Sequence, residues 1–476
     1  MAEETTGDAG SKRGIVLPKR LPLVVTPSNR DDSTTKDARL VNCYMERLET
    51  GETWVNKRPG LDEQSRPPAG NAAGRGVYNW RGDLYSFFGT TLYRNGTSVG
   101  TVDGTNGVYK FSSCLGATPK LQLGNGVLAY NYDTSGGLVQ ITDADFPAAF
   151  IKGWSYLDGT TYVGKANAAI QGSGINAPTT WDALNTITAQ IEPDQGVFLG
   201  KQLVYTIMGK QWTTEVFYDQ ANATGSPLGT VPGAKANWGC ASADGQQDLN
   251  GVLVWPGAGK NASLQVLQMD NVKVQPVSTK PIERLLEGGS YAAGNVASWS
   301  MKWNGHFFYA LTLIAENLTL AYDLVDQMWM QWTDTNGNYF PIVAATYDSG
   351  MRPILQHATN GRLYYADDAY TTDDGDLITV DIYTPNFDGG TRRIKQMNFQ
   401  EFIGDQVEGS VLQVRVNDAD YAPTKWTNFR NVDLSKPRAY LTNCGSFRRR
   451  AHNYRHRCDT RFRLQAVELQ LGLGSM

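Results

Sequence analysis

The sequence predicts an all-β protein: an irregular six- or seven-bladed β-propeller with an additional β-sandwich-like platform region. Three observations predict this class. Glycine is abundant, with 50 of 476 residues, which suits a chain with many tight turns. Turn signals of the Asn-Gly and Asp-Gly type recur along the chain, each beside an aromatic or aliphatic strand. One stretch, residues 301–334, reads as three consecutive strands of a single antiparallel sheet.

Residues 301–334 show the repeating unit most clearly. Asn304-Gly305 predicts a tight hairpin turn, because both central positions of such a turn tolerate φ > 0. An apolar strand follows from Phe308 to Leu313, and a third strand begins at Trp329. Between them the residues alternate with the period of a half-buried strand, with one face formed by Leu318, Leu320, Tyr322 and Leu324 and the other by Thr319, Ala321 and Asp323. The unit has about the size of one propeller blade, roughly 40–45 residues.

The turn signals recur from near Gly76 onward at irregular spacing, which fits diverged blades with variable loops. Before and after this region the pattern changes. Residues 38–61 predict a strand pair outside the repeats, and the last part of the chain contains longer strands. We therefore expect four parts: a flexible N-terminal arm (1–17), an N-terminal segment joining the platform (18–61), the propeller (62–385) and a C-terminal platform with arginine-rich strands (386–476).

One helix is predicted within residues 277–289. Ser278 or Thr279 can cap it, Pro281 lies in its first turn, and Gly288 ends it. Its apolar residues share a face, namely Ile282, Leu285 and Leu286. A lone helix between blades is interpreted as a link or a packing plug.

The composition excludes some classes of protein. A net charge of −4 gives no global signal for nucleic-acid binding. No apolar run reaches the roughly 18 residues of a membrane span, and the polar start of the chain does not resemble a secretory signal. The cysteines are odd in number and lack a CxxC pair, so we expect free thiols in a reducing compartment: Cys43, Cys114, Cys240, Cys444 and Cys458.

No group of residues predicts catalysis, a metal site or a cofactor. The GAGK sequence at 257–260 lacks the upstream glycine of a phosphate-binding loop. His306 and His357 stand alone and are interpreted as hairpin residues. The Asp-rich stretch 367–376 is interpreted as a solvated loop, because its oxygen spacing matches no calcium loop. Four residues carry metal-ligand atoms in a spacing that argues against zinc: Cys444, His452, His456 and Cys458.

An arginine cluster lies near the C-terminus, in residues 446–463. With one acid, Asp459, this stretch carries a net charge of +6, against −10 for the rest of the chain. One interpretation is a surface that contacts DNA phosphates or a protein partner, since guanidinium binds oxyanions through two hydrogen bonds. The other is a strand face whose arginines pair with acids on the propeller or on a neighbouring subunit. The candidate contact residues are Arg448, Arg449, Arg450, Arg455, Arg457, Arg461 and Arg463.

Four stretches together resemble one family, the packaged-DNA stabilisation proteins, also called tail hub or tail nozzle proteins, of short-tailed (podovirus-like) bacteriophages. These stretches are ARLVNCYMER…NKRPGL before the first blade, VSTKPIERLLEG at the predicted helix, NGHFFYALTL…LAYDLVDQMWMQW, and the arginine-rich last strands. The sequence departs from the family pattern at Cys43, Met45 and Leu320, which suggests divergence.

The resemblance implies a structural virion protein without enzymatic activity. Such a protein forms a homo-oligomeric ring, a hexamer, below the portal and its adaptor (head-to-tail connector) protein. The ring extends the DNA channel, helps retain the packaged genome until DNA ejection, and anchors tail fibres or tailspikes and tail-tip proteins. The resemblance also implies non-specific contact with genomic DNA, location in the virion tail, and synthesis in the bacterial host cytoplasm.

The alternative is a propeller that binds or hydrolyses glycans. A hydrolase needs paired carboxylates around a cleft, and the Ser-x-Asp-x-Gly-x-x-Trp hairpin of sialidase-type propellers does not occur in the sequence. A lectin needs aromatic sugar platforms; Trp80, Trp255 and Trp303 lie near turns but suit a core equally well. A propeller fold alone does not decide between these functions.

Overall fold

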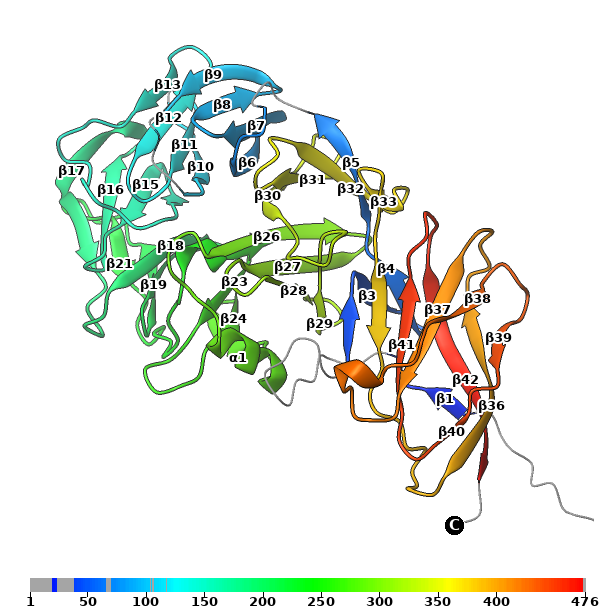
Figure 1. Ribbon diagram of the computed structural model, residues 1–476. Helices are drawn as coiled ribbons and strands as arrows, with labels where there is room; N and C mark the ends of the chain where they lie inside the picture. The colour runs from blue at the N-terminus through cyan, green and yellow to red at the C-terminus, as the bar shows by residue number, and fades with distance from the viewer. Residues whose placement is uncertain are drawn as a thin grey trace, which may run out of the picture.

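The computed structural model describes residues 19–23, 38–65, 70–102, 104, 107–116 and 118–473. The predicted N-terminal arm, 1–17, lies outside them. The described residues form a β-propeller and, beside it, a smaller β-sandwich that we call the platform (Figure 1). The expected all-β class with a propeller is confirmed.

Five blades are plain four-stranded antiparallel sheets. Blade 1 contains β6 (Gly74–Trp80), β7 (Asp83–Phe88), β8 (Thr91–Arg94) and β9 (Thr97–Thr101). Blade 2 contains β10 (Lys110–Cys114), β11 (Lys120–Gly124), β12 (Ala129–Asp133) and β13 (Gly137–Gln140). Blade 3 contains β14 (Ser155–Leu157), β15 (Thr160–Gly164), β16 (Ala169–Gly174) and β17 (Ala177–Thr188). Blade 4 contains β18 (Gly196–Gln202), β19 (Tyr205–Lys210), β20 (Thr214–Asp219) and β21 (Leu228–Thr230). Blade 5, preceded by a 3₁₀ turn at Ala243–Gly245, contains β22 (Gln247–Leu249), β23 (Val252–Gly257), β24 (Gln265–Asp270) and β25 (Lys273–Pro276).

The last two blades are extended. Blade 6 contains β26 (Val296–Trp303), β27 (His306–Leu313), β28 (Leu318–Asp323) and β29 (Met328–Gln331). Blade 7 contains β30 (Ile342–Tyr347), β31 (Pro353–His357) and β32 (Leu363–Asp367), followed by the short β33 (Thr372–Asp373) and β34 (Asp376–Leu377). Its outer strand is β5 (Gly60–Ser65), from before blade 1, which pairs Leu61 with Ala366. The ring closes because β30 lies between β26 and β6. Counted by sheets, the described propeller has seven blades.

β28 corrects one expectation. Its alternation predicted a half-buried strand, but all six of its residues are buried. Tyr322 and Leu320 face a core shared with blade 5 and the helix, whereas Ala321 faces a second core that extends into the platform. Blades stack face to face, so the strand is covered on both sides and its smaller residues also pack.

The predicted helix is confirmed as α1 (Lys280–Glu287). Gly288 is its C-cap, and Thr279 occupies the N-cap position without a side-chain capping bond. The Ser278 hydroxyl instead accepts a hydrogen bond from the backbone of Val266, 3.2 Å away. The apolar face of α1 packs under blades 5 and 6, as a packing plug would.

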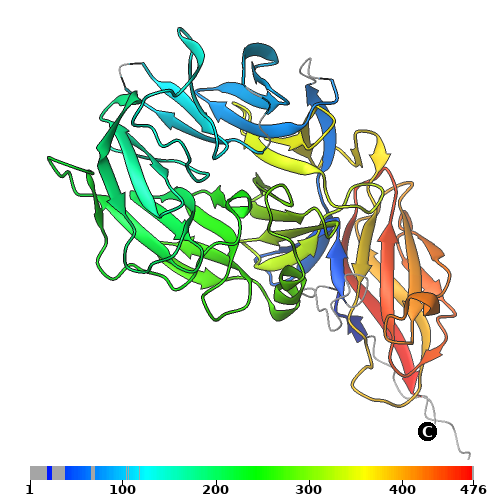
Figure 2. The same ribbon diagram turned by 60° about the vertical axis from the view of Figure 1, so that its left-hand side comes forward.

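The platform consists of two facing sheets (Figures 1 and 2). The first sheet contains β3 (Cys43–Arg47), β4 (Thr53–Lys57), β42 (Arg463–Leu473), β36 (Lys395–Gly404) and β39 (Ala439–Thr442), with β1 (Lys19–Leu21) and β40 (Ser446–Phe447) at its sides. The second contains β35 (Val380–Tyr383), β41 (Ala451–His456), β37 (Val411–Asn417) and β38 (Arg430–Asp433). A 3₁₀ turn, Pro423–Lys425, lies in the loop between β37 and β38. The predicted strand pair in 38–61 is confirmed as the β3–β4 hairpin.

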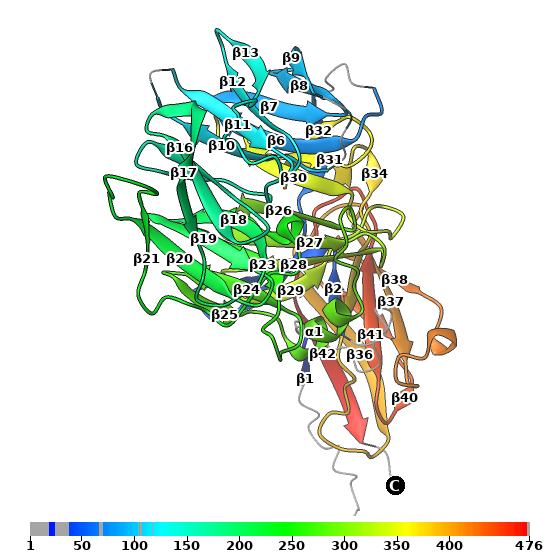
Figure 3. The same cartoon turned by 90° about the vertical axis from the view of Figure 1, so that its left-hand side faces the viewer.

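The propeller and the platform share a sheet. β2 (Arg39–Val41) pairs in parallel with β29 of blade 6, matching Val41 with Gln331, and antiparallel with β35 of the platform. Blade 6 and the second platform sheet therefore form one nine-stranded sheet. Figure 3 shows the platform strands extending from this side of the propeller. A hydrogen-bonded sheet resists bending far more than a flexible linker does.

A buried arginine reinforces this junction. The side chain of Arg58 is 1% exposed, and its guanidinium bonds both carboxylate oxygens of Asp373, at 2.9 and 2.6 Å. It also donates to the Asn42 side chain (3.0 Å) and the Thr333 carbonyl (3.1 Å), and lies over the ring of Phe340. One side chain thus connects the segment between β4 and β5 to blades 6 and 7.

Candidate functional site

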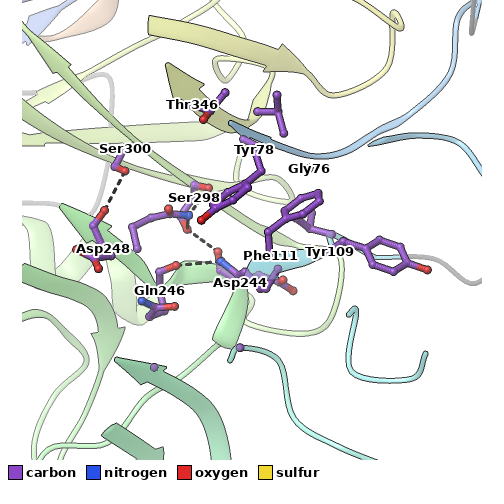
Figure 4. A pocket seen from close by; sticks show the side chains of 18 of the residues that line it. Gly76, Tyr78, Tyr109, Phe111, Asp244, Gln246, Asp248, Ser298, Ser300 and Thr346 are labelled. Carbon is purple, nitrogen blue, oxygen red and sulfur yellow. Dashed lines mark hydrogen bonds between the residues drawn. The ribbon is translucent and has the colours of Figure 1, made fainter. Parts of the chain in front are cut away.

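The centre of the propeller contains a pocket of about 370 Å³ lined by the inner strands of several blades (Figure 4). Tyr78 of β6 stacks on Phe111 of β10, with ring centroids 5.5 Å apart and planes 8° apart. The close packing has a backbone cause: Gly76 has φ +141°, and a Cβ there would touch the Phe111 ring. The pocket therefore has an aromatic wall on one side.

Polar groups also line the pocket, among them Lys110 and Asp244. Lys152 bonds both carboxylate oxygens of Asp244, at 2.6 and 2.9 Å, and Lys110 donates to the backbone carbonyl of Gln246 at 3.0 Å. Burial lowers the pKa of Lys110 to about 8. Burial raises the pKa of Asp248, the other lining carboxylate. Since Asp244 is held in an ion pair, this lining does not supply the two available carboxylates that glycoside hydrolysis requires.

The structure divides the arginine cluster. Arg450 is 3% exposed and bonds both oxygens of Asp418, at 2.7 and 2.8 Å. Arg455 binds Asp381 in the same two-pronged way, at 2.9 Å for each bond. These are the geometries of charge-assisted hydrogen bonds within one chain. Both arginines therefore stabilise the platform.

The remaining arginines are more accessible. Arg463 is half-buried between Glu46 (3.5 Å) and Asp405 (3.8 Å). Arg449 forms an exposed pair with Asp420 at 3.4 Å. Arg448, Arg457 and Arg461 are exposed as well.

β41 keeps these exposed arginines apart. Arg448 and Arg449 precede this six-residue strand and Arg457 follows it, so the two groups lie roughly 20 Å apart along the sheet. The cluster in the sequence therefore becomes two separate basic positions in the fold.

One of these positions borders a cleft that the sequence did not reveal. A cleft of about 380 Å³ lies where blade 6 meets the platform and is lined by Arg39, Arg455 and Arg457. Arg39 lies over the Tyr383 ring, 4.1 Å from its centroid. Arg39 is far from the cluster in the chain, and only the pairing of β2 with β35 brings it there.

His306 does not stand alone, contrary to the interpretation from sequence. Its Nδ1 lies 2.6 Å from Asp323 Oδ2 and 3.6 Å from Asp326 Oδ2. All three side chains are nearly buried. A sequence signal existed: Phe308 pairs with Asp323 in the predicted hairpin, which puts His306 diagonally across from that aspartate on the same face.

The other candidate ligand set does not come together. His452 and His456 lie in the platform core, where burial lowers the pKa of each to about 3. The thiols of Cys444 and Cys458 donate to different backbone carbonyls, and all five cysteines are free. Within the described ranges, His306, Asp323 and Asp326 are the one group of three such side chains whose ligand atoms converge. In the same ranges no helix is long and apolar enough to cross a membrane.

Comparison with solved structures gives distant likenesses. Virginiamycin B lyase from Staphylococcus aureus is 8% identical with a TM-score of 0.42, covering 64% of this chain and 98% of the other. The N-terminal domain of Nup159 is 8% identical with a TM-score of 0.38, covering 69% and 99%. The designed protein Ika8 is 12% identical with a TM-score of 0.35, covering 64% and 99%. At these scores the likenesses carry no argument about function.

Comparison by sequence gives a clear result at the family level. No curated protein matches the chain. The family model described as bacteriophage P22 Gp10, β-propeller, matches residues 29–368. That range runs from before β2 to just after β32 of blade 7, so it covers most of the propeller and the strand that joins it to the platform. The chain therefore belongs to the bacteriophage P22 Gp10 β-propeller family of phage structural proteins.

Proposed function

We propose that the protein is a tail hub, or nozzle, of a short-tailed phage. In this role a hexameric ring of the chain lies below the portal and adaptor, extends the DNA channel, helps retain the packaged genome and anchors tailspikes or fibres and tail-tip proteins. The protein acts by holding other components in place, without catalysis. Its location is the virion tail, after synthesis in the host cytoplasm.

The observation that carries this proposal is the nine-stranded sheet shared by blade 6 and the platform. A ring subunit must transmit load between the neighbours above and below it, and a shared sheet does so without a hinge. The propeller adds rigidity because its blades close on themselves. Contacts between different surfaces that close by rotation generate such rings. The four-part division of the chain stays a prediction; β35 (Val380–Tyr383), which that division gives to the propeller, pairs with β41 of the platform.

The distribution of charge supports a conduit for DNA. A strongly basic wall would hold DNA tightly through counterion release, whereas this chain is acidic overall, at −4. Arg450 and Arg455 are neutralised inside the platform. We therefore assign Arg448 and Arg449, which precede β41, to contacts with a neighbouring subunit or the adaptor.

The test is native mass spectrometry of the purified chain, alone and mixed with its portal–adaptor assembly. We expect ring formation on the assembly, and we expect the double variant Arg448→Glu/Arg449→Glu to lose it while keeping the circular dichroism of the parent. The matched control is Arg81→Glu, which reverses an exposed charge at the hairpin tip of blade 1. A double variant that assembles normally would reject the assignment of these two arginines. A parent chain that ignores the assembly would reject the hub itself.

A second candidate function is glycan binding in the central pocket. It is favoured by the stacked pair of Tyr78 and Phe111 beside polar groups, since sugars bind on aromatic faces with hydrogen bonds at their edges. A glycan array probed with the parent and with Tyr78→Ala tests it. Binding that the substitution abolishes would support this function, and an array without signal would remove it.

A further inference from the structure

The cluster of His306, Asp323 and Asp326 has the donor atoms of a transition-metal site. It offers one imidazole nitrogen and two carboxylate oxygens, all within 4.8 Å of one another. In a tetrahedral zinc site, with bonds of 2.0–2.2 Å, ligand atoms lie about 3.3 Å apart. The distances from His306 Nδ1 to the two oxygens, 2.6 and 3.6 Å, lie on either side of that value. To reach that value, the His306–Asp323 distance would lengthen by about 0.7 Å and the His306–Asp326 distance would shorten by about 0.3 Å.

The ligands are held in place by their surroundings. The His306 ring is stacked on Phe308 and contacted edge-on by Tyr44, at centroid distances of 5.6 and 5.0 Å. The second oxygen of Asp323 accepts the backbone N–H of Val325 at 3.0 Å, which directs the first oxygen toward the histidine. Such outer contacts orient metal ligands and raise affinity for the metal.

The three side chains of the cluster carry more negative than positive charge, and the cation that acts on Asp326 from outside the cluster is the exposed Arg47. Even with a protonated imidazole, two carboxylates leave one negative charge in a region where Asp323 is fully buried and Asp326 is 10% exposed. A divalent ion in place of the proton between His306 and Asp323 would neutralise both carboxylates.

We propose that His306 Nδ1, Asp323 Oδ2 and Asp326 Oδ2 bind one divalent transition-metal ion, of the zinc type, as a structural clamp between blade 6 and the platform. Asp323 ends β28 and Asp326 lies in the turn that leads to β29, and Figure 1 shows β29 close to β3. The clamp reaches β3 through the Tyr44 ring and through the Arg47 backbone N–H, which donates to Asp326. This site does not depend on the proposed ring.

The experiment uses the full chain after treatment with a chelator. Calorimetric titration with Zn²⁺ is expected to give one site per chain, and Co²⁺ is expected to give the visible absorption of a tetrahedral complex. Asp326→Asn keeps the hydrogen bond of His306 to Asp323 and should weaken Zn²⁺ binding about tenfold or more, with His306→Gln losing it further. The matched control is His357→Gln, which removes a histidine in another hairpin and should leave the site intact.

Other ions separate a metal site from simple charge neutralisation. Imidazole disfavours hard cations, so Zn²⁺ should raise Tm while equal concentrations of Mg²⁺ or Ca²⁺ have little effect. Stabilisation of equal size by all three ions would overturn the proposal. Zinc binding that Asp326→Asn leaves unchanged would also overturn it, as would the absence of stoichiometric binding. If His306→Gln fails to fold, Asp326→Asn still decides the question.

Discussion

The buried ion pair of Arg58 and Asp373 allows a direct test of how the propeller and the platform are joined. Asp373→Asn leaves the guanidinium in place, 1% exposed, without the carboxylate that balances it. Removing one partner of a buried ion pair costs about 3–5 kcal/mol, because the remaining charge can neither regain water nor find another partner. Asparagine can still accept one of the two hydrogen bonds, so we expect the lower end, about 3 kcal/mol.

The effect can be read as a change in Tm. An unfolding entropy of about 2.1 cal/mol/K per residue gives about 1 kcal/mol/K for 476 residues unfolding as one unit, so Tm should fall by about 3 °C in scanning calorimetry. The control is Asp374→Asn, the same substitution at the neighbouring position. Asp374 pairs with Arg362, which is partly exposed. That pair should contribute about 0–1 kcal/mol.

A double-mutant cycle checks the cause. In an Arg58→Met background no cation remains to be stranded, so Asp373→Asn should cost less than about 1 kcal/mol. Equal falls in Tm in the two backgrounds, or an equal fall for Asp374→Asn, would refute the reasoning that the stranded charge matters.

Two further predictions concern the platform and the blades. Burial lowers the pKa of His452 and of His456 to about 3 in the folded protein, below the ordinary 6.5. The stability that each neutral histidine contributes is therefore complete above pH 6.5. It declines by about 1.4 kcal/mol per pH unit for each histidine as the pH falls from 6.5 toward 3. His452→Gln should therefore flatten the acid side of the pH–Tm curve, and an unchanged slope would contradict this. At the boundary between blades 3 and 4, Gly153 has φ +103° and a Cβ there would collide with the Leu199 carbonyl. Gly153→Ala should cost about 2 kcal/mol or more in urea unfolding, whereas Gly82→Ala, in an open turn, should cost only the strain of its positive φ.

Local signals in the sequence predicted the elements well. The limits of α1 follow from Pro281 and Gly288, and the β26–β27 turn follows from Asn304-Gly305. These features act within a few residues, through φ preferences and missing N–H groups, so they need no knowledge of the fold. The burial of β28 was underestimated because it depends on the packing of other blades. The alternation of residues shows which face of the strand is more apolar, but it does not show that another blade covers the more polar face.

The arginine cluster shows the limit of reading charge along the chain. Seven arginines within 16 positions of the sequence suggest one basic surface. In the structure, however, Arg450 forms an ion pair with Asp418, and Arg455 forms one with Asp381. An antiparallel strand places its ends far apart and brings in acids from distant segments. The sequence alone therefore could not tell which arginines remain available to a partner.

By itself, the sequence determined that this chain folds into turn-rich antiparallel sheets arranged as a propeller, because turn residues and strand periodicity act locally. Only the tertiary structure decided how those sheets close and join. β5 completes blade 7, β2 joins the propeller to the platform, and Arg58 meets Asp373 across 315 positions of chain. These pairings depend on which surfaces pack together once the blades have formed, and no local pattern in the sequence encodes that choice.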